Sequence, residues 1–141
     1  MSGEHLPDVD DVIAVADFRS ALRTFLRQTE RVARRSGLTP QRYLLLLMIK
    51  GAPDRSEQST VTDLAHRLQL AQSTVTELVN RAEESGLVRR EQSERDARVA
   101  HLRLTAEGER RLGLSFSGLE AERQRLAETV APLRNEEVSG A

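Results

Sequence analysis

The sequence predicts a mainly α-helical protein that carries one small β-hairpin. Three observations lead to this fold class. Apolar residues recur at helical spacing over most of the chain, two short helical segments are joined by a tight turn, and two alternating apolar and polar segments follow them directly. The length of 141 residues suits a single domain, 1–141, with one hydrophobic core.

The composition excludes several classes of protein. With 30% charged and 38% hydrophobic residues, the chain is typical of a soluble folded domain. It has no cysteine, which excludes disulfides and thiolate metal ligands. No apolar run reaches the roughly 20 residues that a membrane span requires, and the polar, acidic N-terminus is unlike a signal peptide. We therefore expect a cytoplasmic protein that does not enter the membrane.

The first element is a long helix over residues 10–36, which Gly37 ends as a left-handed cap. One side of this helix carries arginines at steps of four residues: Arg19, Arg23, Arg27, Arg31 and Arg35. We expect this ridge either to face solvent or to form salt bridges between subunits, rather than to contact DNA directly.

A second helix is predicted to begin at Thr39 and Pro40, an N-cap followed by proline at the first helical position. Its sequence "RYLLLLMIKGA" is apolar on all sides, which predicts a buried central helix. The following residues 52–59 are rich in turn formers and predict a loop without evident chemistry.

Two short helices come next. Thr60 and Asp63 form a capping box at the start of the first, and after a three-residue turn the second runs from about residue 72 to Gly86. In the second helix, one face is apolar and the opposite face is polar. The apolar face consists of Val75, Leu78, Val79 and Ala82.

The hairpin is predicted from strands at residues 87–90 and 99–104. In the second strand Ala100, Leu102 and Leu104 should face inward. A helix-turn-helix followed at once by a hairpin is a winged helix-turn-helix, here residues 39–104 with the wing at 87–104. In such proteins the second helix enters the major groove of DNA, and the wing lies along the backbone.

Residues 105–131 predict a final helical region that Pro132 ends, and residues 134–141 predict a frayed tail. Glycines at 113 and 118 are expected to break or kink the helix. An apolar seam predicts packing against a partner helix. Its members are Leu112, Phe116, Leu119, Leu126 and Val130.

The order of these elements and the amino-acid sequences within them resemble those of the MarR family of bacterial transcriptional regulators. The resemblance rests on "LTPQ" at 38–41, "TDLAHRLQL" at 62–70, "STVTELVNRAEESGLVRR" at 73–90 and "RDARVAHLRLTAEG" at 95–108. It implies a homodimer formed by the terminal helices, 10–36 and 105–131. It further implies that this homodimer binds a pseudo-palindromic operator, usually to repress, and is released by a small phenolic or lipophilic effector.

The resemblance also implies roles for individual residues. Asp96 would orient Arg98 at the tip of the wing toward the minor groove or its phosphates. The neighbouring Arg89, Arg90 and Arg95 would contact the DNA backbone. Asn80 can pair bidentately with adenine, and Glu77 can accept from a cytosine amino group. The predicted DNA-binding residues are Ser73, Thr74, Thr76, Glu77, Asn80, Arg81, Arg89, Arg90, Arg95, Asp96 and Arg98.

The chain departs from the family pattern in three places. Ala71 stands where a serine often caps the helix, and Glu77 makes the second helix of the motif net acidic. The wing should therefore supply much of the attraction to DNA. The stretch after "LTAEG" is also about ten residues shorter than the family pattern implies, so the long N-terminal helix would have to compensate in the dimer.

An effector site is predicted near Tyr43, Arg19 and Arg23, because an aromatic ring and arginines suit a carboxylated aromatic ligand. The alternative is that Tyr43 packs in the core and the arginines form salt bridges. The three histidines lack metal-ligand spacing, and no catalytic constellation or phosphate loop is found. We expect no enzyme activity, no cofactor and no metal. A winged helix that docks another protein remains the alternative to a DNA-binding regulator.

Overall fold

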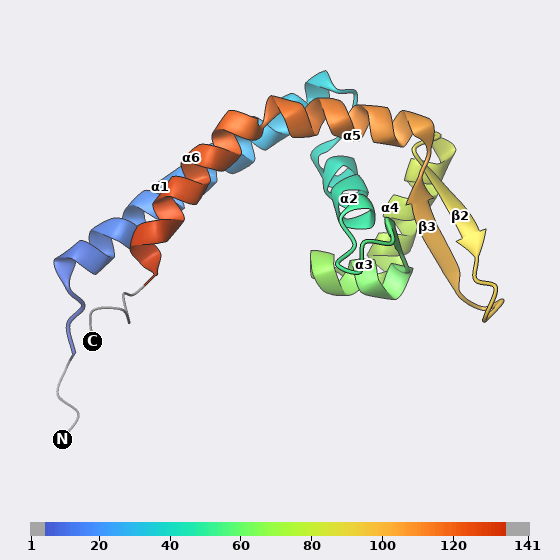
Figure 1. The fold of residues 1–141 in the computed structure, drawn as a ribbon, viewed down its shortest axis with the longest axis horizontal. Helices are drawn as coiled ribbons and strands as arrows, with labels where there is room; N and C mark the ends of the chain where they lie inside the picture. The colour runs from blue at the N-terminus through green and yellow to red at the C-terminus, as the bar shows by residue number, and fades with distance from the viewer. Residues whose placement is uncertain (1–4, 135–141) are drawn as a thin grey trace.

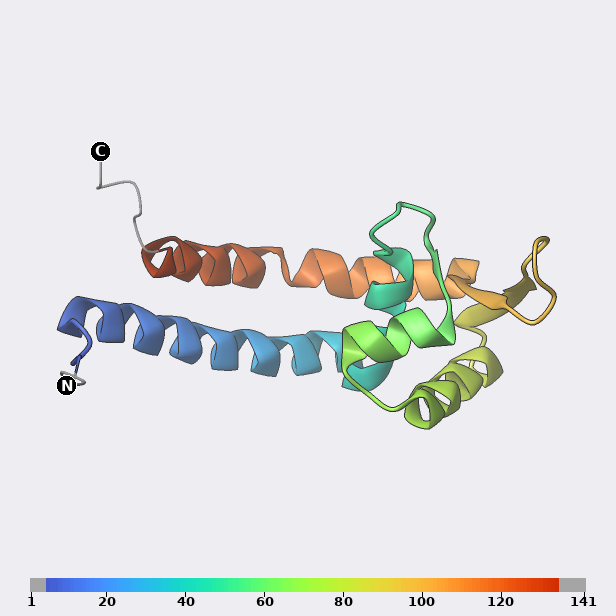
Figure 2. The same ribbon diagram turned by 90° about the horizontal axis from the view of Figure 1, so that it is seen from below.

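The computed structural model describes residues 5–134, which form an elongated arm with a winged region at one end (Figures 1 and 2). α1 (Val9–Arg35) runs the length of the arm. α5 (Ala106–Gly118) and α6 (Glu120–Val130) run back beside it in the opposite direction, so both ends of the described chain lie at the far end of the arm.

Local signals explain the bounds of α1. The Asp8 carboxylate accepts a hydrogen bond from the Asp10 backbone N–H, which caps the N-terminus. Acidic residues occupy the first turn and basic residues the last, which complements the helix dipole. Gly37 follows with a φ of 76°, in the left-handed region that favours glycine. The long helix predicted at 10–36 is confirmed.

The winged region begins with three helices. α2 (Pro40–Lys50), α3 (Val61–Leu68) and α4 (Gln72–Glu84) occur where the sequence predicts them. The capping box of Thr60 and Asp63 is present at the start of α3. No side chain caps α4, as expected from Ala71.

The burial of α2 differs from the prediction on one side. Tyr43, Leu45, Leu46 and Ile49 are buried, but Leu44 is 41% exposed. A helix that is apolar on all sides can be buried all round only if other elements surround it. In the described chain, the elements around α2 leave the Leu44 side open.

The sheet has three strands rather than the two predicted. β2 (Val88–Gln92) and β3 (Ala100–Leu104) form the wing hairpin, and β1 (Gln58–Ser59) pairs with the other edge of β3, giving the order β1-β3-β2. The prediction of a loop at 52–59 is therefore wrong for the last two residues, Gln58 and Ser59, which form a strand. Two residues give too short a pattern for periodicity to detect, and their strand character depends on pairing with β3, which is distant in the sequence.

The C-terminal helical region is broken at Leu119, directly after Gly118, whereas Gly113 leaves α5 intact. The predicted seam is not continuous. Leu112 and Leu119 are buried within the chain itself, but Phe116 is 48% exposed and holds the Arg123 guanidinium 3.8 Å from its ring centre. Leu112 and Phe116 both lie in the uninterrupted helix α5, so the break at Leu119 does not account for the exposure of Phe116. The predicted tail lies outside the described residues, apart from Arg134.

Within residues 5–134, no helix is long and apolar enough to cross a membrane.

Candidate nucleic-acid interface

The outer face of α4 presents polar side chains. Val75, Val79 and Ala82 are fully buried against the core, which fixes the rotation of the helix. The predicted contact residues therefore lie on its outer side. Ser73, Thr74, Glu77, Asn80 and Arg81 are exposed.

Thr76 lies at the edge of this face and is half-buried. Its hydroxyl donates a hydrogen bond of 2.9 Å to the Gln72 carbonyl, one turn earlier in α4. The hydroxyl proton is thus engaged within the helix, and the side chain offers its oxygen and its methyl group to the surface.

The wing tip, residues 93–99, is a turn organised by short polar side chains. Ser93 Oγ accepts hydrogen bonds from the backbone N–H groups of Arg95 and Asp96. Asp96 Oδ1 accepts from the Arg98 backbone N–H at 3.0 Å. These bonds fix the backbone between the strands without a glycine. Sequence reasoning did not single out Ser93, although its place before the charged loop is a turn signal.

Asp96 and Arg98 are brought together as predicted. The Arg98 Nε lies 3.6 Å from Asp96 Oδ1, and the Arg98 side chain is 93% exposed. The carboxylate therefore holds the backbone at Arg98 firmly and its guanidinium only loosely. Arg98 projects into solvent from the end of the wing and remains free to meet an anion.

Arg89 and Arg90 differ from Arg98 because both make close ion pairs, whereas the Arg98 pair is longer. Arg89 Nη1 lies 2.8 Å from a Glu91 carboxylate oxygen. The Arg90 Nε lies 2.5 Å from Glu83 Oε1, and Arg90 Nη2 donates to Asn80 Oδ1 at 2.7 Å. Arg90 thus joins β2 of the wing to the exposed face of α4.

This bridge changes the electrostatics expected from the sequence. Glu77, Glu83 and Glu84 against Arg81 make α4 net acidic when it is counted alone. In the fold, Arg90 neutralises Glu83. Sequence reasoning missed Glu83, because the pair joins two elements and only the folded arrangement brings it together.

Lys50, the only lysine in the chain, connects the winged region to the arm. Its Nζ lies 2.8 Å from a Glu109 oxygen in α5 and 2.9 Å from a Glu57 oxygen beside β1. Hydrogen bonds to Glu109 and then to Glu57 raise the pKa of Lys50 above its usual value. The pair of contacts fixes the end of α2 relative to α5.

The residues predicted to bind an effector are placed in different surroundings. Tyr43 is buried, and this burial raises the pKa of its phenol, an effect that the nearby Arg123 charge opposes. Arg19 and Arg23 are exposed on α1. Arg23 lines a shallow groove of about 390 Å³ that does not include Tyr43. The groove is lined by Ser20, Arg23, Thr24, Arg27, Gln28 and Arg31.

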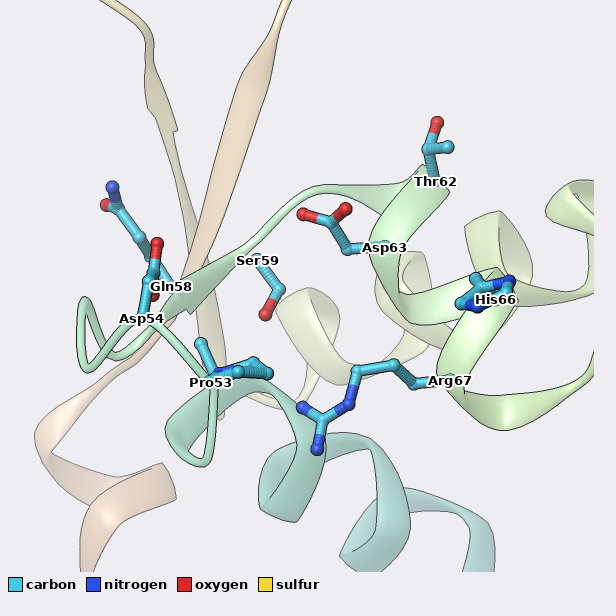
Figure 3. Close-up of a pocket in the computed structure, with 9 residues that line it drawn as sticks. Pro53, Asp54, Gln58, Ser59, Thr62, Asp63, His66 and Arg67 are labelled. Atoms are coloured by element: carbon cyan, nitrogen blue, oxygen red, sulfur yellow. The ribbon is translucent and has the colours of Figure 1, made fainter.

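A larger hollow, of about 610 Å³, lies between α3 and the segment that leads into β1 (Figure 3). Asp63, His66 and Arg67 border it from α3, and Pro53 and Asp54 from the segment opposite. Arg67 is not free, because its Nη1 donates to the Met48 and Gly51 carbonyls at the end of α2. Within the part of the chain that the structure describes, no group of three or more acidic or histidine side chains is placed to hold a metal ion.

Comparison with known proteins gives a family match and many similar structures. The sequence model described as MarR family matches residues 36–99, which include α2, α3, α4 and the start of the wing. No curated protein matches the chain.

Three similar solved structures illustrate the likeness. A mutant MarR from E. coli with operator DNA is 18% identical, with 86% of this chain and 82% of that chain covered and a TM-score of 0.63. The M. tuberculosis transcriptional regulator MOSR with DNA is 29% identical, with coverage of 80% and 77% and a TM-score of 0.58. AbsC, a MarR family transcriptional regulator from Streptomyces coelicolor, is 23% identical, with coverage of 97% and 84% and a TM-score of 0.61.

The family match falls on the helix-turn-helix and the start of the wing, and the structural likeness extends over the arm as well. The chain therefore matches the MarR family over its winged region and shares the winged helix-turn-helix fold of these solved structures.

Proposed function

We propose that this chain is a DNA-binding transcriptional regulator that acts as a homodimer and represses by occupying a pseudo-palindromic operator. The observation that carries the proposal is the placement of two surfaces in one domain. The polar outer face of α4 and the arginine-bearing wing tip are both exposed and both belong to a MarR-type winged helix. Two of the similar structures are complexes with DNA.

The two surfaces suit two different parts of a DNA duplex. A helix fits the major groove, where hydroxyl, amide and charged side chains can contact base edges. A thin hairpin with exposed guanidinium groups suits the adjacent backbone or a narrow minor groove. In this arrangement α4 supplies most of the sequence preference, and Arg95 and Arg98 supply most of the attraction to phosphate.

A dimer is supported by apolar side chains that the arm leaves uncovered. On α1, Val12 and Ile13 are 48% and 52% exposed, and a hollow of about 320 Å³ that Val12 lines is bordered almost wholly by apolar atoms. Exposed apolar residues that cluster along one element usually mark an interface. The set comprises Val9, Val12, Ile13, Val15, Leu26, Leu114 and Phe116.

Repression follows from this arrangement if the operator overlaps a promoter. A two-fold dimer places two copies of α4 in successive major grooves, about one helical turn apart. We further propose that a small aromatic acid binds near Tyr43, Arg19 and Arg23 and changes the spacing of the two winged regions. The exposed guanidinium groups of α1 provide the cationic groups that such a ligand requires, and the ring of Tyr43, which is buried in this structure, would have to become accessible to provide the aromatic one.

Electrophoretic mobility shift and footprinting with the DNA upstream of the chain's own coding sequence test the proposal. We expect a protected pseudo-palindrome, with an affinity that falls steeply as salt is raised. Addition of benzoate or a related aromatic acid should reduce the shift. If a genomic fragment pool gives no bound DNA at low salt, the chain is not a DNA-binding regulator, and the docking of another protein becomes the better assignment.

A further inference from the structure

Arg90 is the one arginine of the wing strands that contacts the exposed face of α4. Its Nε pairs with Glu83 at 2.5 Å, and its Nη2 donates to Asn80 Oδ1 at 2.7 Å. The Arg90 and Glu83 side chains are only 38% and 32% exposed, so this pair is better shielded than the Arg98 pair at the wing tip.

The contact fixes which way the Asn80 amide is turned. A guanidinium group has five N–H donors and no acceptor, so only the oxygen of the amide can face it. The NH₂ group of Asn80 consequently points away from Arg90. Asn80 is exposed on α4, so this group is available to a ligand on the outer face of the helix.

We propose that Arg90 is a positioning residue that turns the Asn80 amide so that its NH₂ group faces a base edge. Asn80 then acts toward the base as a hydrogen-bond donor only, and not as both donor and acceptor. This inference rests on the proposed function, because it concerns how α4 contacts DNA. Guanine offers two acceptors in the major groove, N7 and O6, which suit a donating NH₂ group. The bidentate contact with adenine expected from the sequence also needs the amide oxygen to face the base, and the hydrogen bond from Arg90 Nη2 instead holds that oxygen toward the wing.

Glu83 has a definite part in this arrangement. Its carboxylate holds the Arg90 Nε, so that Nη2 is directed at Asn80 rather than at solvent. The ion pair also cancels the charge of Arg90, which makes this arginine a weaker attractor of phosphate than Arg95 or Arg98. Arg90 therefore affects DNA binding by orienting Asn80, and not by attracting phosphate as Arg95 and Arg98 do.

The experiment is selection from a pool of DNA duplexes with a randomised segment of about 20 base pairs, enough for two half-sites. The full-length wild type is compared with Arg90→Ala, Arg90→Lys, Asn80→Ala and Glu83→Gln. Arg89→Ala is the matched control, because Arg89 is the adjacent arginine but pairs with Glu91 on its own strand. Affinity is then measured at several salt concentrations for the selected site. It is also measured for versions of that site in which the base pair that depends on Asn80 is changed.

We expect the wild type to select guanine at one base pair of each half-site. Arg90→Ala should shift that base pair toward adenine, with a change of about tenfold in the ratio of the two affinities. Asn80→Ala should lose preference at the same base pair, and Arg89→Ala should keep it. Arg90→Lys keeps the charge but cannot donate along two directions from one planar group, so it should also lose the preference.

Other results would overturn the inference. Arg90 would instead be a phosphate contact if Arg90→Ala lost affinity equally for all sequences and showed a smaller salt dependence. Arg90→Lys would then retain full function. If Arg90→Ala does not fold, Arg90→Lys and Glu83→Gln decide the matter, since both retain a polar group of similar size. Failure of the wild type to select any DNA would instead contradict the proposed function itself.

Discussion

Gly108 lies directly against the backbone of Leu87, so close that a Cβ atom on Gly108 would stand 2.1 Å from the Leu87 carbonyl oxygen. Beside this contact, the Thr105 hydroxyl donates to the Gly86 carbonyl at 2.6 Å and accepts from the Gly108 N–H at 3.1 Å. The "LTAEG" segment therefore joins the first turn of α5 to the start of the wing. Its threonine forms the hydrogen bonds, and its glycine permits the close approach.

Gly108→Ala should strongly destabilise the protein, by roughly 1–3 kcal/mol or more, because two backbones must separate to admit the methyl group. Chemical denaturation measures the effect. Gly113→Ala is the matched control, since it lies in the same helix and a Cβ there meets nothing within 4 Å. That control should gain about 0.5–1 kcal/mol from helix propensity. Equal stabilities for the two variants would contradict the close contact.

Arg98→Ala should weaken binding to every DNA sequence by a similar factor. The side chain is 93% exposed at the wing tip, where a guanidinium can neutralise a phosphate. The slope of log affinity against log salt should fall by about 1.8 in magnitude, about 0.9 for each of the two phosphate contacts that the homodimer loses. Arg110→Ala serves as control, because Arg110 lies on α5 and is paired with Glu107. An unaltered salt slope in Arg98→Ala would remove the wing tip from the interface.

Val12→Asp should convert the proposed dimer into a monomer. Val12 lies on the exposed apolar part of α1, and a carboxylate buried there against a second copy would have no partner. Sedimentation velocity measures the change in mass. Leu70→Asp is the matched control, since Leu70 is a similarly exposed apolar residue, 40% exposed, at the turn between α3 and α4 and outside the arm. A dimer that persists in Val12→Asp would place the interface elsewhere.

The single tyrosine provides a clear pH measurement, because the chain has no tryptophan. Burial raises the pKa of Tyr43 above its usual value of 10.0, so the absorbance of tyrosinate should appear at higher pH in the folded protein than in denaturant. The unfolded chain releases this proton first. Tyr43 therefore contributes stability that is complete below pH 10 and declines as pH rises toward its folded pKa. Ionisation at the same pH in both states would contradict the burial.

The pKa of Glu107 should lie at about 2, because hydrogen bonds from Arg110 and then Arg111 stabilise its charged form. Its ordinary value is 4.5. The contribution of this carboxylate to stability is thus complete above pH 4.5 and is lost as the pH falls through about 2. Titration of the carboxyl carbon by NMR measures the pKa directly. In Glu107→Gln, the acid dependence that this group contributes should be absent.

Much of the fold could be predicted because it depends on local signals. Thr39, Thr60 and Thr105 each cap the helix that follows, and the left-handed glycines at 37 and 86 stand just after helix ends. These residues act within one turn of their own position. The exposed face of α4 could be predicted for a similar reason, since helical periodicity alone fixes which side chains are opposite the apolar ones.

The candidate site was less predictable where two elements meet. From the sequence, Arg90 is one of five arginines in a charged hairpin, and Glu83 is an unremarkable residue near a helix end. Their pairing depends on how β2 and α4 are placed by the core as a whole, in which Val79 and Val88 are both buried. Such pairs have no signature in a single sequence, because many other arginines and glutamates lie at similar separations along the chain.

By itself, the sequence determined the order of elements, their caps, the rotation of α4 and the likeness to the MarR family, because each depends on residues close together in the chain. Only the tertiary structure decided that β1 joins the sheet, that Leu112 and Leu119 separate from Phe116, and that Arg90 contacts Asn80. The physical reason is that these features require distant segments to approach within hydrogen-bonding or packing distance. The direction of that approach is set by the whole core and not by any local pattern.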